Sequence, residues 1–448
     1  MSERTSLAGP PAHWLLGHAR EFRADWLAFL IRCARDYGDF VPLRLGLRRV
    51  LLISDPHAIE EVLLTRSRDF KKHFGLQLTR QLLGNGLLNS EGEFWLRQRR
   101  LAQPAFLRDR IREYGRMMID DTRHVMAGWK PGERRDLVVE MQALTLRLAT
   151  RTLFDAEEAG DAAEIRRQLE KSMRLFSERF RSLIQVPLGW PTPRNLRQRR
   201  ITRALNAIIY RYIEQRRREP LEGRHDLLSR LLAARDETGD GAGMTDAQLR
   251  DEVMTMFLAG QETTAVALTW TWYLLSEHPE VEARMMDELR RELGERPLTA
   301  DDVSRLKYTE AIVNEALRLY PPAYLLGREA LRDVTIAGQR IRKKTTVFMV
   351  EWITHRDPRW WPEPERFRPE RWLDGSTKDL PKYAYFPFGG GPRVCIGNTF
   401  AMMEAVVVLT EIARRFRFER TSREPLRPVP SITLRPDKPL EVVLHPRG

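Results

Sequence analysis

Residues 386–397 read F-P-F-G-G-G-P-R-V-C-I-G and contain Cys395, one of only two cysteines in a chain of 448 residues. The glycines Gly389, Gly390 and Gly391 allow backbone angles and close approaches that a side chain would forbid. The pattern of residues 396–409 predicts a helix directly after the cysteine, and a helix N-terminus lowers the pKa of a nearby thiol. A lone cysteine is more often an inert small hydrophobe, but the surrounding pattern favours a thiolate that binds a metal.

The pattern formed by Phe388, Gly391, Arg393, Cys395 and Gly397 resembles the haem-binding signature of the cytochrome P450 family. Other landmarks of that family follow in the same order along the chain: Trp95 with Arg99, A-G-Q-E-T-T at 259–264, Glu315 with Arg318, and F-R-P-E-R-W at 367–372. Each landmark is weak alone, but together they are specific, and the resemblance covers nearly the whole chain. It implies the cytochrome P450 fold, mainly α with a small β portion, as a single large domain enclosing haem over residues 1–448.

The resemblance implies haem b, iron protoporphyrin IX, as the cofactor and Cys395 as the iron ligand. Phe388 would cover the thiolate from solvent, and Gly397 would let the following helix pass close under the porphyrin. The two haem propionates need several hydrogen-bond donors. The family positions for that role are Trp95, Arg99 and Arg393, with Arg328 as a fourth candidate. His355 is not expected to bind iron, because the thiolate fills one axial position and the other must stay open.

The longest helical pattern covers residues 245–276 and opens with a T-x-x-Q capping box. Ala259 and Gly260 are small enough for this helix to pass over the open iron face, and the weakened backbone at Gly260 can open to admit dioxygen and water. Glu262 and Thr263 would supply the protons that O–O bond cleavage requires. The plainer alternatives are a threonine bonded to its own helix and a glutamate in an ordinary ion pair.

Glu315 and Arg318 lie one turn apart on a helix predicted over residues 307–320, which ends before Pro321. Exposed pairs at this spacing contribute only ~0.2 to 0.5 kcal/mol. The resemblance adds Arg371 as a third, buried member, and removing one partner from a buried network costs ~3 to 5 kcal/mol. We therefore interpret the triad as structural, fixing the cysteine loop for haem insertion.

A chain of 448 residues would normally suggest two or three domains, but no Gly/Ser tract, repeat or low-complexity block divides it, which favours one large domain built around a cofactor. Strand patterns are few and fall at residues 50–54, 335–341 and 346–350. Cys33 and Cys395 lie too far apart in sequence for a disulfide framework, which favours a reducing compartment; Cys33 is expected in the core.

No run reaches the ~18 apolar residues that a membrane-spanning helix needs, and no signal region is present. The expectation is a bacterial cytoplasmic enzyme without a membrane anchor or transmembrane segment. The chain ends at residue 448, shortly after Cys395, so no fused reductase is expected and electrons should come from a separate protein.

The formal net charge is +13, from 75 Lys and Arg against 62 Asp and Glu. The basic residues are spread along the chain and form no nucleic-acid motif, so a nucleic-acid partner is not expected and a solvated surface explains most of the charge. An acidic ferredoxin or flavodoxin-type donor is expected on the cysteine side of the haem. The segments expected there carry Arg97, Arg100, Arg108, Arg110, Arg366, Arg368, Lys378 and Lys382.

The predicted function is a haem-thiolate monooxygenase, since a thiolate ligand favours O–O cleavage. The alternatives are a thiolate-haem enzyme that uses peroxide or isomerises its substrate, and a haem-based binding or sensor protein. Family-aligned pocket positions are mostly apolar: Leu88, Phe257, Ala259, Ala323, Tyr324 and Ile432. They suit a small lipophilic substrate such as a fatty acid, terpenoid or carotenoid, with O2 as co-substrate.

Overall fold

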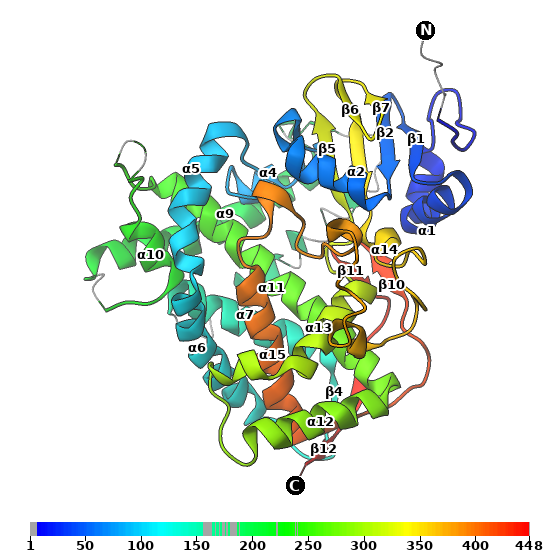
Figure 1. The fold of residues 1–448 in the computed structure, drawn as a ribbon. Helices are drawn as coiled ribbons and strands as arrows, with labels where there is room; N and C mark the ends of the chain where they lie inside the picture. The colour runs from blue at the N-terminus through cyan, green and yellow to red at the C-terminus, as the bar shows by residue number, and fades with distance from the viewer. Residues whose placement is uncertain are drawn as a thin grey trace.

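Helix α11 (Asp246–Glu277) runs through the middle of the protein, and the other long helices pack around it in the computed structural model (Figure 1). The predicted capping box is confirmed: the Gln248 N–H donates to Thr245 Oγ1, and the Thr245 N–H donates to the Gln248 side chain. Every residue from Thr264 to Leu275 is buried, as expected of a helix enclosed on all sides by other helices. This central helix therefore sets the frame for the site.

The structure describes residues 7–155, 164–165, 167–169, 171–172, 175, 178–179, 186–187, 189–220, 223–237, 239 and 241–447. Its longer helices besides α11 are α1 (Ala19–Tyr37), α5 (Gly92–Ala102), α6 (Arg108–Met126), α7 (Leu137–Phe154), α9 (Pro193–Arg218), α10 (Leu227–Ala233), α12 (Pro279–Leu293), α13 (Lys307–Leu319) and α15 (Asn398–Arg415). The shorter α-helices are α2 (Pro56–Glu60), α3 (Phe74–Gln77), α4 (Arg80–Leu83) and α14 (Glu351–Thr354). Helix α13 ends one residue earlier than predicted, and α15 begins two residues later and runs farther.

The strands form a small portion of the molecule: the sheet that contains β1, β2 and β5 lies at one end, whereas β4 and β12 lie near the opposite end, close to the C-terminus (Figure 1). A five-stranded sheet has the order β1 (Phe40–Leu45), β2 (Arg48–Ile53), β8 (Thr346–Met349), β5 (Leu326–Ala330), β3 (Phe70–Lys72), with β2 and β8 parallel and the other neighbours antiparallel. Smaller sheets join β6 (Val334–Ile336) to β7 (Gln339–Ile341), β10 (Pro428–Pro430) to β11 (Leu434–Pro436), and β4 (Arg134–Asp136), β12 (Glu441–Pro446) and β9 (Phe416–Arg420). The fold is thus mainly α with a small β portion, as predicted.

One predicted strand was wrong. Residues 335–341 form a hairpin, β6 and β7, because the chain reverses at Ala337 and Gly338, which both have positive φ angles. The apolar pattern of the two short strands continues across the turn and hides it in the sequence.

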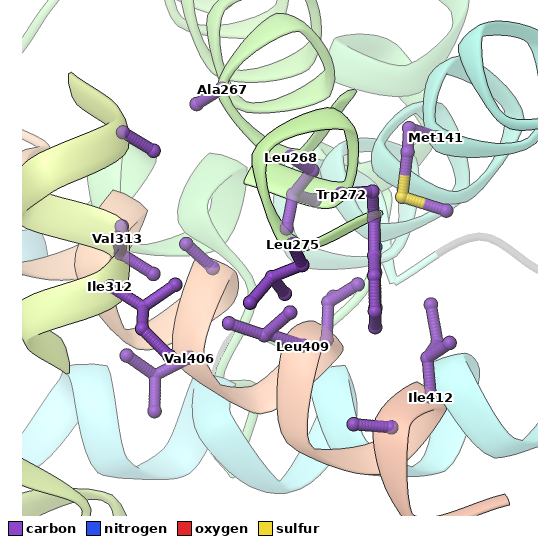
Figure 2. Packing of buried hydrophobic residues seen from close by; sticks show 14 of the residues in the cluster. Met141, Ala267, Leu268, Trp272, Leu275, Ile312, Val313, Val406, Leu409 and Ile412 are labelled. Carbon is purple, nitrogen blue, oxygen red and sulfur yellow. The ribbon is translucent and has the colours of Figure 1, made fainter. Parts of the chain in front are cut away.

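The main hydrophobic core lies where α11, α13, α15 and α7 meet (Figure 2). Leu268 and Leu275 of α11 lie close to Leu409 of α15 in this view. Burying a side chain of this size stabilises the fold by ~1.5 to 3 kcal/mol. The core holds α11 and α15 in fixed positions, and α15 is the helix that follows Cys395.

Among the residues that the structure describes, no helix is both long and apolar enough to cross a membrane. Cys33 lies in the core with 2% of its surface exposed, as predicted.

Candidate active site

The cysteine loop, residues 386–397, is held by contacts that only glycine permits. Gly391 has φ +63°, and a Cβ there would lie 1.8 Å from the Leu63 carbonyl oxygen. A Cβ at Gly390 would lie 2.2 Å from the Tyr383 ring. Both distances are far below any real contact, so the chain of residues 61–65 and the cysteine loop can approach only because these positions lack a side chain.

Within this loop, the backbone N–H of Cys395 donates to the carbonyl oxygen of Phe388 at 2.9 Å. Phe388 itself is partly buried against the main core, and Gly397 is the N-cap residue of α15. The residues of the predicted signature are therefore brought together around the sulfur.

The environment of the thiol differs from expectation. The Cys395 side chain is exposed to solvent, yet burial raises the pKa of its thiol, while a hydrogen bond from the Gly397 N–H and the charge of Arg99 act to lower it. These two facts agree if the sulfur faces a space inside the protein instead of its outer surface. The predicted lowering by the helix N-terminus does not outweigh burial; coordination to a metal would deprotonate the thiol by itself.

Several cations gather beside the loop. Arg99 donates to the Val394 carbonyl oxygen at 2.9 Å, and Arg393 stacks on the Trp95 ring with 4.2 Å between guanidinium carbon and ring centroid. Among the described residues, the side chain of Arg328 donates only to the Gly327 carbonyl oxygen. Burial and, to a lesser extent, repulsion from Arg393 lower the pKa of Arg328 to about 10. All four predicted propionate contacts thus lie in one region.

Three neighbours in this region were not predicted. Glu91 forms an ion pair with Arg393 and accepts a hydrogen bond from the Lys72 N–H. His73 is buried, and burial lowers its pKa to about 4. Lys72 is also buried, which lowers the pKa of its ammonium group, and the Arg393 charge lowers it further. No short sequence pattern marks these residues, because they meet only through the tertiary fold.

These residues fit a haem. A haem carries two carboxylates and needs an axial ligand, and the site offers an accessible thiol together with more cationic side chains than carboxylates. The lowered pKa values of Lys72, Arg99, Arg328 and Arg393 mean that their charged forms lack sufficient anionic partners in the protein itself. Arg99, Arg328 and Arg393 are the groups that would hold the propionates.

The distal helix offers space where the sequence predicted it. A Cβ added at Gly260 would meet no heavy atom within 4 Å, and Ala259 is exposed although it lies on the central helix. Thr263 donates to the Ala259 carbonyl oxygen at 2.6 Å, which is the plainer of the two arrangements considered for it. The helix continues through Gly260 without an interruption.

The Glu262 carboxylate is hydrogen-bonded to residues outside its own helix. Its carboxylate accepts hydrogen bonds from Thr433 Oγ1 at 2.8 Å and from Arg435 Nε at 2.6 Å, and it is buried. In this arrangement the carboxylate is an ion-pair partner of β11, so relaying a proton would require the Arg435 contact to loosen.

Glu315, Arg318 and Arg371 form a buried, hydrogen-bonded triad. Glu315 accepts from Arg318 at 2.8 and 3.0 Å and from Arg371 at 2.9 Å, and each of the three side chains is at most 2% exposed. Arg318 also donates to the His355 carbonyl oxygen at 2.8 Å, and His355 Nε2 accepts from the Phe386 N–H at 3.0 Å. The triad is thereby connected to the first residue of the cysteine loop through His355.

A cavity beside α11 is lined by seven polar or charged residues and five apolar ones. It contains Ile432 from the predicted set, accompanied by Leu78, Leu82, Leu175 and Leu258. The other predicted pocket residues do not line it. Phe257 and Tyr324 are buried in core clusters, with the Tyr324 hydroxyl donating to the Ser431 carbonyl oxygen, whereas Leu88 and Ala323 keep part of their surface accessible.

The buried carboxyl groups of Glu252 and Glu404 were not singled out from the sequence. Glu252 of α11 accepts from the Leu87 N–H at 3.0 Å, and Lys72 donates to the Leu87 carbonyl oxygen at 2.7 Å, so the two side chains clamp one residue next to Leu88. Glu404 of α15 is buried against Thr264, and burial raises its pKa to about 8. A single glutamate inside the apolar stretch A-M-M-E-A-V-V-V was the available signal for Glu404.

Comparison with known proteins agrees with this geometry. The cytochrome P450 family model matches residues 7–444. The chain is 37% identical to cyclooctat-9-en-7-ol 5-monooxygenase of Streptomyces melanosporofaciens, over 99% of this chain and 96% of that enzyme. It is 35% identical to pentalenene oxygenase of Streptomyces avermitilis, over 100% and 97%. The haem domain of cytochrome P450DA superposes with a TM-score of 0.89 at 28% identity, covering 99% of this chain and 98% of that one.

The chain therefore belongs to the cytochrome P450 family. It is a P450 monooxygenase, and the family and fold imply a haem cofactor.

Proposed function

We propose that this enzyme inserts one oxygen atom from O2 into a terpenoid, using haem b and electrons from a separate acidic donor. The observation that carries the proposal is the accessible Cys395 thiol beside an excess of cationic side chains. The names of two relatives, cyclooctat-9-en-7-ol 5-monooxygenase and pentalenene oxygenase, support a terpenoid substrate. Leucines and Ile432 in the cavity beside α11 suit such a lipophilic molecule.

When bound, the haem supplies a thiolate-ligated iron that activates dioxygen. The residues of the chain bind the haem and limit the access of water to it. Cys395 provides the ligand, the backbone N–H of Gly397 hydrogen-bonds its sulfur, and Phe388 limits the access of water. Arg99, Arg328 and Arg393 hold the carboxylates of the cofactor in place.

Thr263 and Glu262 are proposed to manage protons on the distal side. The Thr263 hydroxyl, now bonded to Ala259, would turn toward the substrate side, and Glu262 would exchange protons when its contact with Arg435 loosens. We expect Thr263→Ala to retain haem and substrate but to release hydrogen peroxide in place of product. Full coupling of reductant to product in that variant would assign the role to another group.

The ligand assignment is tested by spectroscopy. The reduced carbon monoxide complex should show the strongly red-shifted Soret band of thiolate ligation, and Cys395→Ser should lose it. Cys33→Ser is the matched control and should keep it, because Cys33 lies in the core. A panel of terpene hydrocarbons, terpene alcohols, fatty acids and carotenoids, followed by the iron spin shift, then identifies the substrate class. No shift with any terpenoid would contradict that part of the proposal.

We retain three basic residues as candidates for the docking site of the electron donor. Arg97 and Arg100 pair with Asp236, Arg110 with Glu113, Arg366 with Glu363, and Arg368 with Asp374. The exposed Arg108, Lys378 and Lys382 have no acidic partner among the described residues. Lys382 adjoins Tyr383, which packs against Gly390 of the cysteine loop.

Lys382→Glu should therefore slow haem reduction by an acidic ferredoxin without changing substrate affinity. Raising the ionic strength should slow reduction of the wild-type enzyme, because redox encounters are small and steered by charge. A rate that does not change with salt for every acidic donor would argue against this docking site.

A further inference from the structure

Helix α9 (Pro193–Arg218) concentrates the positive charge of the molecule. It contains nine arginines and one acidic residue, Glu214. The sequence from residue 179 to residue 213 contains no Asp or Glu at all. The net charge of +13 is therefore not spread evenly along the chain, as the sequence had suggested, but is largely carried by this one helix.

The arginines in the two halves of α9 differ in whether they have ion-pair partners. In the second half, Arg216 pairs with Asp226, Arg217 with Asp246 and Arg218 with Glu214. In the first half, Arg197, Arg200 and Arg203 are exposed and follow one another at intervals of three residues, so they project from one side of the helix. None of these three side chains has a hydrogen bond or an ion pair within the described part of the chain. Their charge is thus directed at solvent or at a partner.

Apolar side chains accompany these arginines. Leu196 is 40% exposed, and Trp190 in the preceding turn is 62% exposed. That turn is folded onto the start of the helix, because Asn195 Nδ2 donates to the Trp190 carbonyl oxygen at 2.9 Å and Arg199 donates to the Gly189 carbonyl oxygen at 2.7 Å. An exposed indole beside unpaired guanidinium groups is the combination that suits a lipid headgroup region.

The same turns of α9 also reach the cavity. Arg194, Asn195 and Gln198 line it together with Leu258 and Ile432. One side of these turns therefore faces the cavity, and the other carries the exposed arginines.

We propose that Trp190 and the first three turns of α9 dock on the surface of an anionic lipid bilayer. Arg197, Arg200 and Arg203 bind the lipid phosphates, and Trp190 and Leu196 enter the interface. The enzyme would then take its lipophilic substrate from the bilayer past α9, whose opposite side lines the cavity, and this last step rests on the proposed function. An acidic protein would also attract the arginines, but it gives less reason for a tryptophan to be exposed beside them.

Vesicle sedimentation of the haem-loaded, full-length enzyme tests the docking. Binding is expected to phosphatidylcholine vesicles that contain phosphatidylglycerol, with little binding to phosphatidylcholine alone, and added salt should release it. Since each basic residue near an anionic surface contributes roughly fivefold to binding, the triple variant Arg197→Gln, Arg200→Gln, Arg203→Gln should lose roughly 100-fold. Trp190→Ala should lose less.

The matched control is Arg134→Gln, Arg415→Gln, Arg423→Gln. These arginines are also exposed, their side chains have no hydrogen bond or ion pair in the described part of the chain, and they lie around β4 and the end of α15, away from α9 (Figure 1). The control should bind anionic vesicles almost as wild type. The carbon monoxide spectrum of each variant shows that it is folded and loaded.

Three results would overturn the proposal: no binding of wild type to anionic vesicles, equal loss in both triple variants, or binding to heparin or an acidic protein without binding to vesicles. The second would show an effect of net charge alone, and the third would show a different class of partner. None of these measurements uses turnover, so a failure of the proposed terpenoid oxidation would leave the vesicle result unaffected.

Discussion

Two sets of arginines lie near the cysteine loop, and they differ in burial and in how completely they are satisfied. All five N–H donors of Arg318 have acceptors, two on Glu315 and three on backbone carbonyl oxygens. Among the described residues, the side chain of Arg328 has a single acceptor, the carbonyl oxygen of Gly327. Arg318 is fully buried and Arg328 is partly exposed, and only the first has its bonding completed by the chain.

This difference distinguishes an arginine that stabilises the fold from one that can bind a ligand. A buried charge whose hydrogen bonds are complete fixes structure and has nothing left to offer a ligand. A partly buried charge with open donors and a lowered pKa, such as Arg328, costs stability until an anion joins it. Arginine therefore has a structural role at one position of this protein and a binding role at another. The number of hydrogen-bond acceptors around each guanidinium group distinguishes the two roles.

The largest expected effect comes from Arg318→Met. Removing this side chain leaves Glu315 with fewer partners and the carbonyl oxygens of His355 and Pro364 without their side-chain donor, so the free energy of unfolding should fall by ~3 to 5 kcal/mol. Denaturant titration of the haem-loaded and haem-free protein measures it. The loss should be similar in both forms; a loss seen only with haem would mean that the triad is part of the binding site.

Glu404 tests a third situation, a buried carboxyl group with one hydroxyl partner. Its pKa is raised from 4.5 to about 8, so the folded state binds the proton more tightly than the unfolded state does. Its contribution to stability is complete below pH 4.5 and is lost as the pH rises through about 8. Glu404→Gln should remove this loss and become the more stable protein at pH 8 by up to a few kcal/mol.

The comparison is made between wild type and variant at each pH, because Glu252, whose pKa is also raised to about 8, adds a slope to both proteins. Parallel stability curves for the two proteins would show that Glu404 does not titrate in this range.

Arg328→Met is the matched partner of Arg318→Met and should have the smallest effect on folding. The haem-free protein should keep its stability or gain some, because a poorly bonded, partly buried charge is removed. Haem should leave the variant roughly 10 to 100 times faster, the equivalent of one lost hydrogen bond to a charged group. Transfer of haem to excess apomyoglobin measures the rate, and an unchanged rate would remove Arg328 from the site.

The parts predicted correctly are those written in short stretches of sequence. The capping box at Thr245, the end of α13 and the spacing of Glu315 with Arg318 all depend on neighbours within one or two turns. The signature around Cys395 is also contiguous. Local chemistry and periodicity were sufficient for these features.

The parts that were missed depend on contacts between distant segments. Glu91 meets Arg393, and Lys72 meets Leu87 and Glu252, only because the sheet, the loop before α5 and α11 converge. The rise in the pKa of the Cys395 thiol likewise follows from burial, which the sequence around it does not reveal. Asp236 neutralises Arg97 and Arg100 from a segment more than a hundred residues away.

The contacts that hold the cysteine loop have a consequence for how the protein is made. Arg99 reaches the Val394 carbonyl oxygen across 295 residues, and Arg393 reaches the Ser90 carbonyl oxygen across 303. Contacts this distant in sequence form late and slowly. The loop can close only after the ribosome has synthesised nearly the entire chain, so capture of the cofactor belongs to the final stage of folding. Cells that produce this enzyme must therefore supply haem to an almost complete polypeptide.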